Sequence, residues 1–235
     1  MNTESRLPSQ TDINVSEASA PHAGQIRITE IFLSLQGESR TVGYPTVFVR
    51  LTGCPLRCGY CDTRYAFQGG EWMTIESILE KVAAYNTHHI TVTGGEPLAQ
   101  RECGGLLTRL CDTGYEVSLE TSGALDVSTV DVRVVKVMDL KTPGSLEEAK
   151  NCWDNLQHLT TQDQIKFVLC DRADYDWAKQ KIEQHNLLGC CDVLFSPSFE
   201  QLQPVTLADW IIEDRLLVRF QVQLHKVLWG DEQGR

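Results

Sequence analysis

The feature that most constrains this chain is a group of three cysteines within eight residues. Cys54, Cys58 and Cys61 are separated by three and then two residues, in a loop that also contains Pro55 and Gly59. Cysteine thiolates are the usual protein ligands of iron–sulfur clusters. Three of them can wrap one compact inorganic core and leave its fourth corner open. The loop therefore predicts a [4Fe–4S] cluster bound by these three residues.

Two other interpretations of the loop remain open. Zinc could be bound by three cysteines and a histidine, but the nearest histidines, His22 and His88, lie more than twenty residues away along the chain. Packed core thiols fit poorly in a loop that contains glycine and proline. We interpret the other six cysteines as small core side chains, because they fall in predicted helices or strands without ligand spacing. They are Cys103, Cys111, Cys152, Cys170, Cys190 and Cys191.

Charge and hydropathy narrow the class of protein. The formal net charge of −11 disfavours a broad nucleic-acid surface and favours a small-molecule substrate. No stretch approaches the ~18 to 20 apolar residues of a membrane span, and the N-terminus lacks the order of a secretory signal. An odd number of cysteines, nine, with three in one short loop, argues for metal rather than disulfides. We expect a cytoplasmic protein with no membrane or nucleic-acid partner.

Residues 1–24 are polar and without apolar periodicity, which predicts a disordered tail, and residues 25–235 are predicted to form one catalytic domain. Beyond the tail, short β-rich runs alternate with helical patterns. The predicted strands are 28–35, 46–51, 90–93, 115–120, 134–139, 164–170, 192–196 and 217–224. The predicted helices are 74–85, 100–113, 173–186 and 206–214, with another beginning at Ser145 on a capping-box pattern.

Alternating strands and helices predict parallel strands joined by right-handed crossovers, in an open doubly wound sheet or in an open or complete barrel. The cysteine loop and five further polar segments follow the predicted strands. Because the carboxyl ends of parallel strands share one face, we expect these six features to form one site. The five segments are 93–97, 120–123, 139–144, 196–198 and 224–226.

The three-cysteine loop, with an aromatic residue before the last cysteine and Thr-Gly-Gly-Glu-Pro at 93–97, resembles the signature of radical S-adenosylmethionine enzymes. The resemblance implies a partial, open TIM-type parallel barrel. It also implies that the free corner of the cluster binds the methionyl amine and carboxylate of S-adenosylmethionine. An electron from the cluster then gives a 5′-deoxyadenosyl radical.

Residues 28–230 are similar to the 7-carboxy-7-deazaguanine synthase family. The matching motifs are FLSLQGES at 32–39, GYPTVFVRLTGC at 43–54, CDT at 61–63, ETSG at 120–123 and QLHKVLWG at 223–230. The resemblance implies conversion of 6-carboxy-5,6,7,8-tetrahydropterin to 7-carboxy-7-deazaguanine with loss of ammonia, in the queuosine pathway. It also implies dependence on Mg2+, an electron donor such as flavodoxin or ferredoxin, and a homodimer.

The same resemblance assigns roles to individual residues. Arg50 and His225 are expected to be catalytic, with Arg50 pairing its planar guanidinium with the substrate carboxylate. The hydroxyl of Thr63 is expected to bind Mg2+. The residues expected around S-adenosylmethionine are Tyr60, Cys61, Asp62, Gly94, Gly95, Glu96, Asp139, Leu140 and Lys141. Those expected around the pterin are Leu35, Gln36, Gly37, Arg50, Thr93, Ser196 and Pro197.

Two rival functions remain at this point. A glycyl-radical activase shares the cysteine loop and the Gly-Gly-Glu-Pro motif but acts on a protein, and the segments at 32–39, 61–63 and 223–230 argue against it. A zinc or iron–sulfur module that only binds or transfers electrons belongs to another class. Formation of 5′-deoxyadenosine would distinguish a radical enzyme from such a module.

Overall fold

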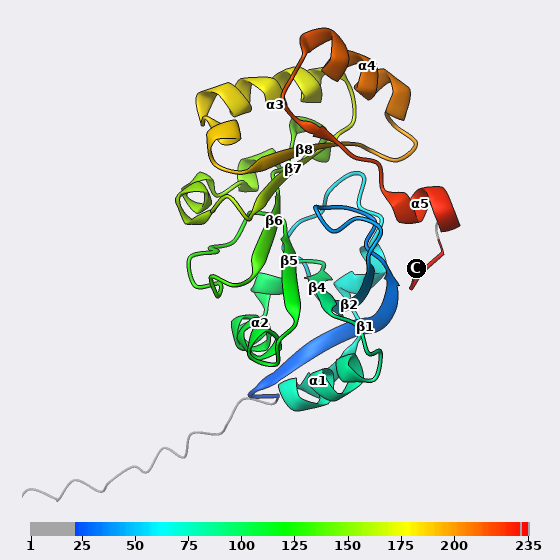
Figure 1. Ribbon diagram of the computed structural model, residues 1–235, viewed down its shortest axis with the longest axis vertical. Helices are drawn as coiled ribbons and strands as arrows, with labels where there is room; N and C mark the ends of the chain where they lie inside the picture. The colour runs from blue at the N-terminus through cyan, green and yellow to red at the C-terminus, as the bar shows by residue number, and fades with distance from the viewer. Residues whose placement is uncertain (1–21, 231, 235) are drawn as a thin grey trace, which may run out of the picture.

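Nine strands form one sheet in the order β3-β1-β2-β4-β5-β6-β7-β8-β9 in the computed structural model, which describes residues 22–230 and 232–234. The strands are β1 (Gln25–Leu35), β2 (Pro45–Leu51), β3 (Glu71–Thr74), β4 (His89–Gly94), β5 (Glu116–Thr121), β6 (Val135–Asp139), β7 (Gln164–Leu169), β8 (Asp192–Pro197) and β9 (Arg219–Phe220). All neighbours from β2 to β9 are parallel, whereas β1 is antiparallel to β2 and β3. Because β3 and β9 stay at the two edges, the sheet curves without closing (Figure 1). The prediction of a partial parallel barrel is confirmed.

The first four helices cover the outer face of this sheet, and the C-terminal helix lies apart from that face (Figure 1). The helices are α1 (Ile75–Ala83), α2 (Cys103–Asp112), α3 (Arg172–Gln184), α4 (Pro204–Asp214) and α5 (Leu224–Trp229). Helix α1 illustrates why they form where they do. The Thr74 side chain caps its first turn by accepting from Ser77 N, and Ile78 and Val82 on its apolar stripe are buried.

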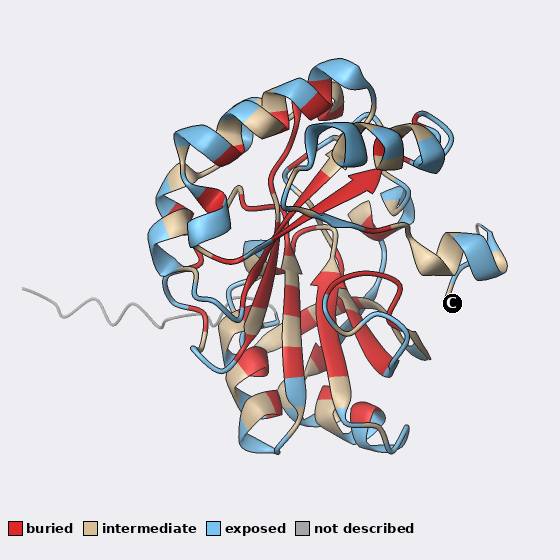
Figure 2. Cartoon of the chain, turned by 45° about the horizontal axis from the view of Figure 1, so that its top comes forward, coloured by how far each residue is buried: buried red, intermediate tan, exposed pale blue. Residues whose placement is uncertain are grey.

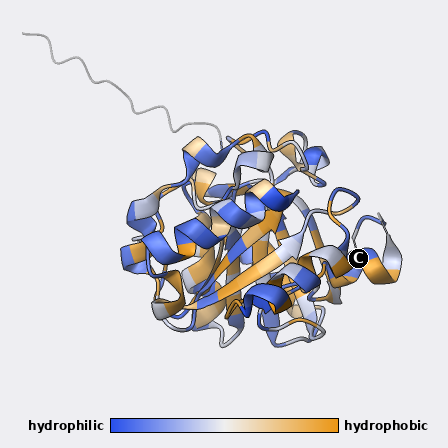
Figure 3. Cartoon of the chain, turned by 90° about the horizontal axis from the view of Figure 1, so that it is seen from above, coloured by the Kyte–Doolittle hydropathy of each residue, from blue (hydrophilic) through white to orange (hydrophobic). Residues whose placement is uncertain are grey.

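Apolar packing falls into two clusters on the outer side of the sheet. One joins α1 and α2 to β1, β2, β4 and β5, and the other joins α3 and α4 to β6, β7 and β8. Figure 2 shows the buried residues concentrated in the strands and on the inner sides of the helices, whose outer sides are exposed. Figure 3 shows the matching hydropathy, with apolar strands inside polar helices. Because the apolar side chains pack on the outer face of the sheet, the carboxyl ends of the strands remain accessible to a ligand.

The strand register determines which polar side chains lie together. Arg50 on β2 is opposite Glu30 on β1 and opposite Thr93 on β4. On the other half of the sheet, Asp139 at the end of β6 is opposite Lys166 on β7. Residues paired across neighbouring strands project to the same face. Charged groups on both halves of the sheet therefore project from its carboxyl edge.

Three sequence predictions of secondary structure were wrong. Strand β3 was not predicted, and the strand predicted at 217–224 is reduced to Arg219–Phe220, with the histidine-bearing segment in α5. The helix predicted from Ser145 is absent from the described residues. Pro143–Ser145 forms a 3-10 turn that ends at Leu146 with a φ of 65°, and the Ser145 hydroxyl donates to Thr142 O instead of capping a helix. A left-handed residue directly after the turn prevents the helix from continuing.

Residues 1–21 of the predicted tail lie outside the described residues, so the division into a tail and a catalytic domain stays a prediction.

Candidate active site

A cavity of about 640 Å3 lies at the carboxyl ends of the strands. This volume is in the range of small-molecule sites, roughly 300 to 1,000 Å3. Most of the residues expected from the sequence line it: Leu35, Gln36, Gly37, Arg50, Cys54, Cys58, Tyr60, Cys61, Asp62, Thr63, Thr93, Gly94, Gly95, Asp139, Lys141 and His225. Four expected residues, Glu96, Leu140, Ser196 and Pro197, are not part of its wall.

The cysteine loop is held by hydrogen bonds to its own backbone and to neighbouring segments. Arg57 Nη1 donates to Cys54 O at 2.7 Å and to Leu56 O at 2.6 Å, while its guanidinium lies 4.3 Å from the centre of the Phe67 ring. Gly59 N donates to Ser145 O at 3.0 Å. The Cys54 sulfur also accepts a hydrogen bond from Leu56 N at 3.4 Å, a contact that a thiolate ligand can keep. Most of the bonds that arrange the loop therefore come from groups other than its thiols.

The three thiols are partly buried and line one wall of the cavity. Burial raises the pKa of the Cys54 and Cys58 thiols, so a cluster has to displace their protons when it binds. Among the described residues, no three Cys, His, Asp or Glu side chains are grouped to hold one metal ion. In a [4Fe–4S] cluster each thiolate binds a different iron, so the three thiols do not have to meet at one metal atom.

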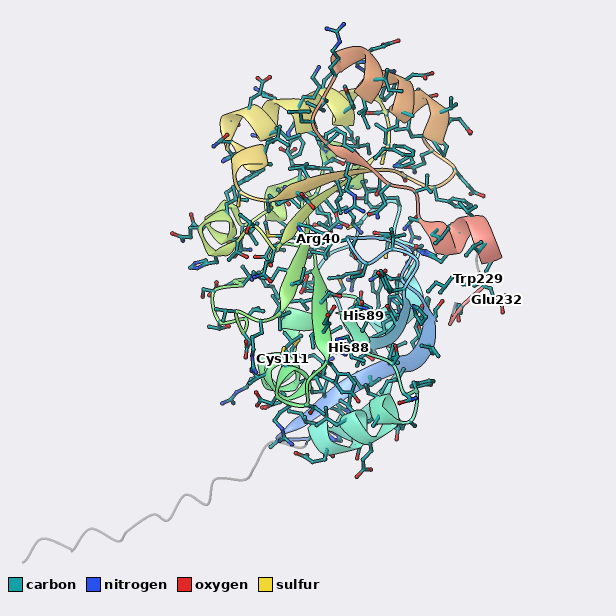
Figure 4. The ribbon with its side chains drawn as sticks, in the orientation of Figure 1. Arg40, His88, His89, Cys111, Trp229 and Glu232 are labelled. Atoms are coloured by element: carbon teal, nitrogen blue, oxygen red, sulfur yellow. The ribbon has the colours of Figure 1, made fainter. Side chains whose placement is uncertain are left out.

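The two histidines considered for a zinc site, His22 and His88, lie outside the cavity wall. His22 stacks on Trp72. His88, labelled in Figure 4 with its neighbour His89, lies at the amino-terminal end of β4, where both rings approach the Glu116 carboxylate. The cysteine loop lies at the opposite, carboxyl end of that strand, where Glu96 N donates to O of Gly53, the residue before Cys54. Cys111, also labelled, is on α2.

Gly94 and Gly95 allow two backbones to meet. A Cβ on Gly94 would collide with Leu51 O, and one on Gly95 would collide with Gly53 O. Glu96 N donates to Gly53 O at 2.8 Å, which completes this contact. The glycines therefore bring the end of β4 against the residues that lead into the cysteine loop, in addition to lining the cavity.

Glu96, expected near S-adenosylmethionine, lies next to the cavity wall. Its carboxylate is fully buried and accepts hydrogen bonds from Leu98 N, from the Thr121 hydroxyl and from both the amide and the hydroxyl of Ser122. Thr121 and Ser122 line the cavity, whereas Glu96 does not. The geometry therefore places Glu96 behind the wall, where it fixes the two residues after β5.

Two buried polar atoms in the cavity wall lack a hydrogen-bond partner within the described residues. They are Tyr60 Oη and Asp139 Oδ1. Lys141 Nζ bonds the other Asp139 oxygen, Oδ2, at 3.1 Å and lies 5.8 Å from the centre of the Tyr60 ring. Buried polar groups without partners are costly, and they are commonly satisfied by a ligand. This side of the cavity fits the polar parts of S-adenosylmethionine.

Arg50 is fixed at the opposite side of the cavity. Its Nε bonds Glu30 Oε1 at 2.7 Å, and the Tyr65 hydroxyl donates to the same oxygen at 2.8 Å. The guanidinium also lies 5.9 Å from the centres of the Phe32 and Tyr65 rings. With only 16% of its side chain exposed, Arg50 is oriented before any substrate arrives.

A buried ionic network connects the two sides. Lys166 Nζ pairs with Glu38 Oε2 and lies 3.6 Å from Asp139 Oδ2. Burial opposes ionisation of Glu38, but the charge of Lys166 and its hydrogen bond outweigh burial and lower the Glu38 pKa to about 2. Glu120 accepts from the Thr93 hydroxyl at 3.2 Å, and burial raises its pKa despite the influence of Lys166. The two carboxylates are therefore pushed toward opposite protonation states.

Thr63 and His225 lie at the same cavity. The Thr63 hydroxyl donates to Asp62 Oδ1 at 2.8 Å, which places two oxygen atoms together next to the last cysteine. The His225 ring packs so closely on Gly37 that no Cβ would fit there. Burial lowers the pKa of His225, which favours the neutral imidazole.

The remaining expected residues support the wall without joining it. Leu140 is fully buried, and its amide donates to Lys166 O at 2.9 Å. Ser196 and Pro197 end the buried strand β8, and it is the following Ser198 and Phe199 that line the cavity. A substrate contact at Ser196 and Pro197 stays a prediction.

Glu120 and Lys166 are two cavity residues that were not predicted from the sequence. Both could have been found from the pattern: Glu120 begins the polar ETSG segment at the end of a strand, and Lys166 interrupts the otherwise apolar run QIKFVL of β7. A charged residue in a buried strand requires a partner. Their partners, however, lie more than 25 residues away along the chain and become visible only in the fold.

Comparisons with known proteins agree with this site. The sequence model of the Radical SAM superfamily matches residues 48–139. A 7-carboxy-7-deazaguanine synthase from Chlorobaculum tepidum is 46% identical over 210 residues, which cover 88% of this chain and 96% of that protein. The chain belongs to the 7-carboxy-7-deazaguanine synthase family. A second member, from Koribacter versatilis, is 42% identical over 88% of this chain and 98% of its own length.

A solved structure shows the same fold. The crystal structure of QueE from Escherichia coli superposes with a TM-score of 0.71 at 21% identity, covering 88% of this chain and all of that one. As a radical SAM enzyme of the 7-carboxy-7-deazaguanine synthase family, the chain uses a [4Fe–4S] cluster, S-adenosylmethionine and Mg2+. No helix among residues 22–230 and 232–234 is long and apolar enough to cross a bilayer.

Proposed function

We propose that the enzyme converts 6-carboxy-5,6,7,8-tetrahydropterin to 7-carboxy-7-deazaguanine, with loss of ammonia, in the cavity between the cysteine loop and Arg50. One observation carries this proposal beyond family membership. A preoriented guanidinium and a set of buried carboxylates line the same cavity as the three thiols. An anionic, hydrogen-bonding substrate of pterin size suits that combination.

Arg50 binds the substrate carboxylate in this proposal. Because Glu30 and Tyr65 hold the guanidinium from the Nε side, its two terminal nitrogens can form a bidentate contact with a carboxylate. The charge is needed locally, since the chain as a whole carries −11 and repels anions. Thr93, directly opposite Arg50 in the register, contributes a hydroxyl at the same end of the substrate.

The pterin ring contacts the loop after β1. The Gln36 side chain is fixed at both ends, because its amide donates to the Thr91 hydroxyl at 3.0 Å and its Oε1 accepts from Glu38 N at 3.2 Å. Its oxygen can accept a second hydrogen bond from the ring edge. Glu38 stays ionised because Lys166 and Gln223 bind its two oxygens. Glu120 can hold a proton at its carboxyl group and deliver it to the nitrogen that leaves as ammonia.

Cys54, Cys58 and Cys61 hold the cluster, and Tyr60, Asp139 and Lys141 face S-adenosylmethionine beside it. When bound, these two groups supply the radical chemistry that removes a hydrogen atom from C6 of the pterin. The hydroxyl of Thr63, beside the Asp62 carboxylate, binds Mg2+. Glu96 keeps Thr121 and Ser122 in the wall, and Leu140, Ser196 and Pro197 support the adjoining strand ends.

We also propose that the enzyme works in the cytoplasm as a homodimer and receives its electron from a flavodoxin or a ferredoxin. Reducing conditions are supported by nine cysteines that are all free in the described residues.

The proposal is tested by anaerobic turnover. Reconstituted enzyme is incubated with dithionite, S-adenosylmethionine, Mg2+ and the carboxy-tetrahydropterin, and products are identified by mass spectrometry against authentic 7-carboxy-7-deazaguanine. We expect the deazapurine to form and to disappear when S-adenosylmethionine or the pterin is omitted. Formation of 5′-deoxyadenosine without any deazapurine would exclude this substrate while leaving a radical enzyme of other specificity.

A further inference from the structure

The loop after β1 is joined to the C-terminal segment by a set of buried hydrogen bonds. Gln221 Oε1 accepts from Ser39 N at 2.8 Å, and Gln221 Nε2 donates to Ser39 O at 3.0 Å. One side-chain amide thus satisfies both backbone groups of a residue 182 positions away. Both residues are nearly inaccessible, Ser39 at 2% and Gln221 at 6% exposure. Neither has been assigned a role in the site described above.

Ser39 needs this support because its backbone is left-handed, with a φ of 69°. A residue with a Cβ pays roughly 1 to 2 kcal/mol for that conformation. Its amide and carbonyl are also buried, where unpaired backbone groups are costly. The Gln221 amide pairs with both buried backbone groups of Ser39, as a neighbouring β-strand would. These two hydrogen bonds offset the cost of the left-handed conformation.

Adjacent residues extend the contact toward the cavity. Leu224 N donates to Gly37 O at 3.0 Å, and Gln223 Nε2 donates to Glu38 Oε1 at 2.9 Å. The His225 ring fills the space that a side chain on Gly37 would need. Gly37, Glu38, Gln223 and His225 all line the cavity. Figure 4 labels Trp229 and Glu232 farther along the same C-terminal segment.

We propose that Gln221 is a positioning residue, which holds Ser39 in the left-handed conformation and thereby places Gly37 and Glu38 against His225. The inference rests on the proposed pterin site at this loop. Its consequence is specific: loss of the Gln221 amide should disorder the pterin side of the cavity and leave the cysteine loop intact. Substrate affinity should fall, whereas cleavage of S-adenosylmethionine without substrate should continue.

The test uses the reconstituted holoenzyme and five proteins: the parent, Gln221→Ala, Ser39→Gly, the double variant and the control Gln203→Ala. Gln203 is an exposed glutamine at the start of α4 that makes no side-chain capping bond. We expect Gln221→Ala to raise KM for the pterin about 10-fold with kcat within about threefold, the loss expected for an unpaired buried amide. Gln203→Ala should match the parent.

The double variant decides between positioning and general destabilisation. Glycine adopts a positive φ without strain, so Ser39→Gly should recover at least half of the lost affinity in the Gln221→Ala background. A double variant no better than Gln221→Ala, or a Gln221→Ala enzyme with parental KM, would overturn the proposal. If Gln221→Ala cannot be reconstituted, Gln221→Glu replaces it, because its carboxylate still accepts from Ser39 N but cannot donate to Ser39 O.

Amide hydrogen exchange keeps this inference separate from the proposed function. Gln221→Ala should speed exchange in residues 36–41 at least 10-fold, and Ser39→Gly should reduce that increase. If the parent fails to convert the pterin while exchange behaves in this way, the proposed substrate is wrong and the positioning role stands. Unchanged exchange in residues 36–41 would overturn the role itself.

Discussion

Replacement of Arg50 by alanine tests the substrate assignment most sharply. The Arg50 side chain is only 16% exposed, and its guanidinium is already held by Glu30, which also accepts from Tyr65. Little further entropy is therefore lost when the guanidinium binds a substrate. A charge-assisted bidentate contact with a carboxylate contributes about 1.5 to 3 kcal/mol. At ~1.4 kcal/mol per decade, Arg50→Ala should lower kcat/KM for the pterin roughly 10- to 150-fold.

The assay measures deazapurine formation at several pterin concentrations under anaerobic conditions, together with iron content and S-adenosylmethionine cleavage without pterin. Iron content and S-adenosylmethionine cleavage without pterin should stay at the parental level, because Arg50 is not a ligand of the cluster. Arg109→Ala provides the control, since Arg109 forms an exposed pair with Glu76 far from the cavity. Such exposed pairs contribute little to stability.

Two further variants sharpen the interpretation. Arg50→Lys should recover only part of the activity, because an ammonium cannot hold both carboxylate oxygens in one plane. Glu30→Gln should have a smaller effect than Arg50→Ala, since it loosens the guanidinium without removing it. The reasoning is refuted if Arg50→Ala retains parental kcat/KM, and Lys141 or Lys226 would then be the candidate for binding the carboxylate.

Three other predictions concern the metals and the buried ion pair. Changing Cys54, Cys58 or Cys61 to serine should abolish the cluster absorbance and S-adenosylmethionine cleavage, and any such variant with full iron content and activity would contradict the cluster assignment. Thr63→Ala should raise the Mg2+ concentration needed for half-maximal activity at least fivefold with the cluster intact, so an unchanged Mg2+ titration counts against the ligand. Glu38→Gln should lower stability to denaturant at pH 7 by about 3 kcal/mol, because Lys166 loses its main partner. Since the Glu38 pKa is lowered to about 2, its contribution is complete above its ordinary pKa and is lost as pH falls toward 2; a parent–variant difference that stays constant from pH 7 to pH 2.5 would refute this.

Local patterns in the sequence predicted most of the fold. Alternation of β-rich runs and apolar helical stripes, as at Ile78 and Val82, identified the parallel sheet and the helices that cover it. The failures have physical causes. Ser145 and Glu148 match a capping box, but Pro143 and the left-handed Leu146 stop the chain from becoming helical. Residues 217–224, just before His225, were predicted as a strand, yet only Arg219 and Phe220 pair with β8.

The site was predictable where chemistry depends on adjacent residues and unpredictable where it depends on the fold. The three cysteines are recognisable from their spacing, and Thr63, Gly94 and Gly95 from the resemblance to the family; all six line the cavity. The partners of buried charges are not recognisable in this way. Glu38 meets Lys166 across 128 positions of sequence, and Gln221 meets Ser39 across 182. Glu96 shows the same limit, because its hydrogen bonds from Thr121 and Ser122 become visible only once β4 and β5 lie side by side.

The most direct test of the central claim is the stoichiometry of the reaction in the reconstituted enzyme. Ammonia and 7-carboxy-7-deazaguanine are quantified from the same anaerobic incubation, with the Cys58→Ser protein as a parallel sample. We expect one ammonia for each deazapurine with the parent enzyme and neither product with the Cys58→Ser enzyme. Recovery of unchanged pterin from a parent that cleaves S-adenosylmethionine, or equal product from both proteins, would contradict it.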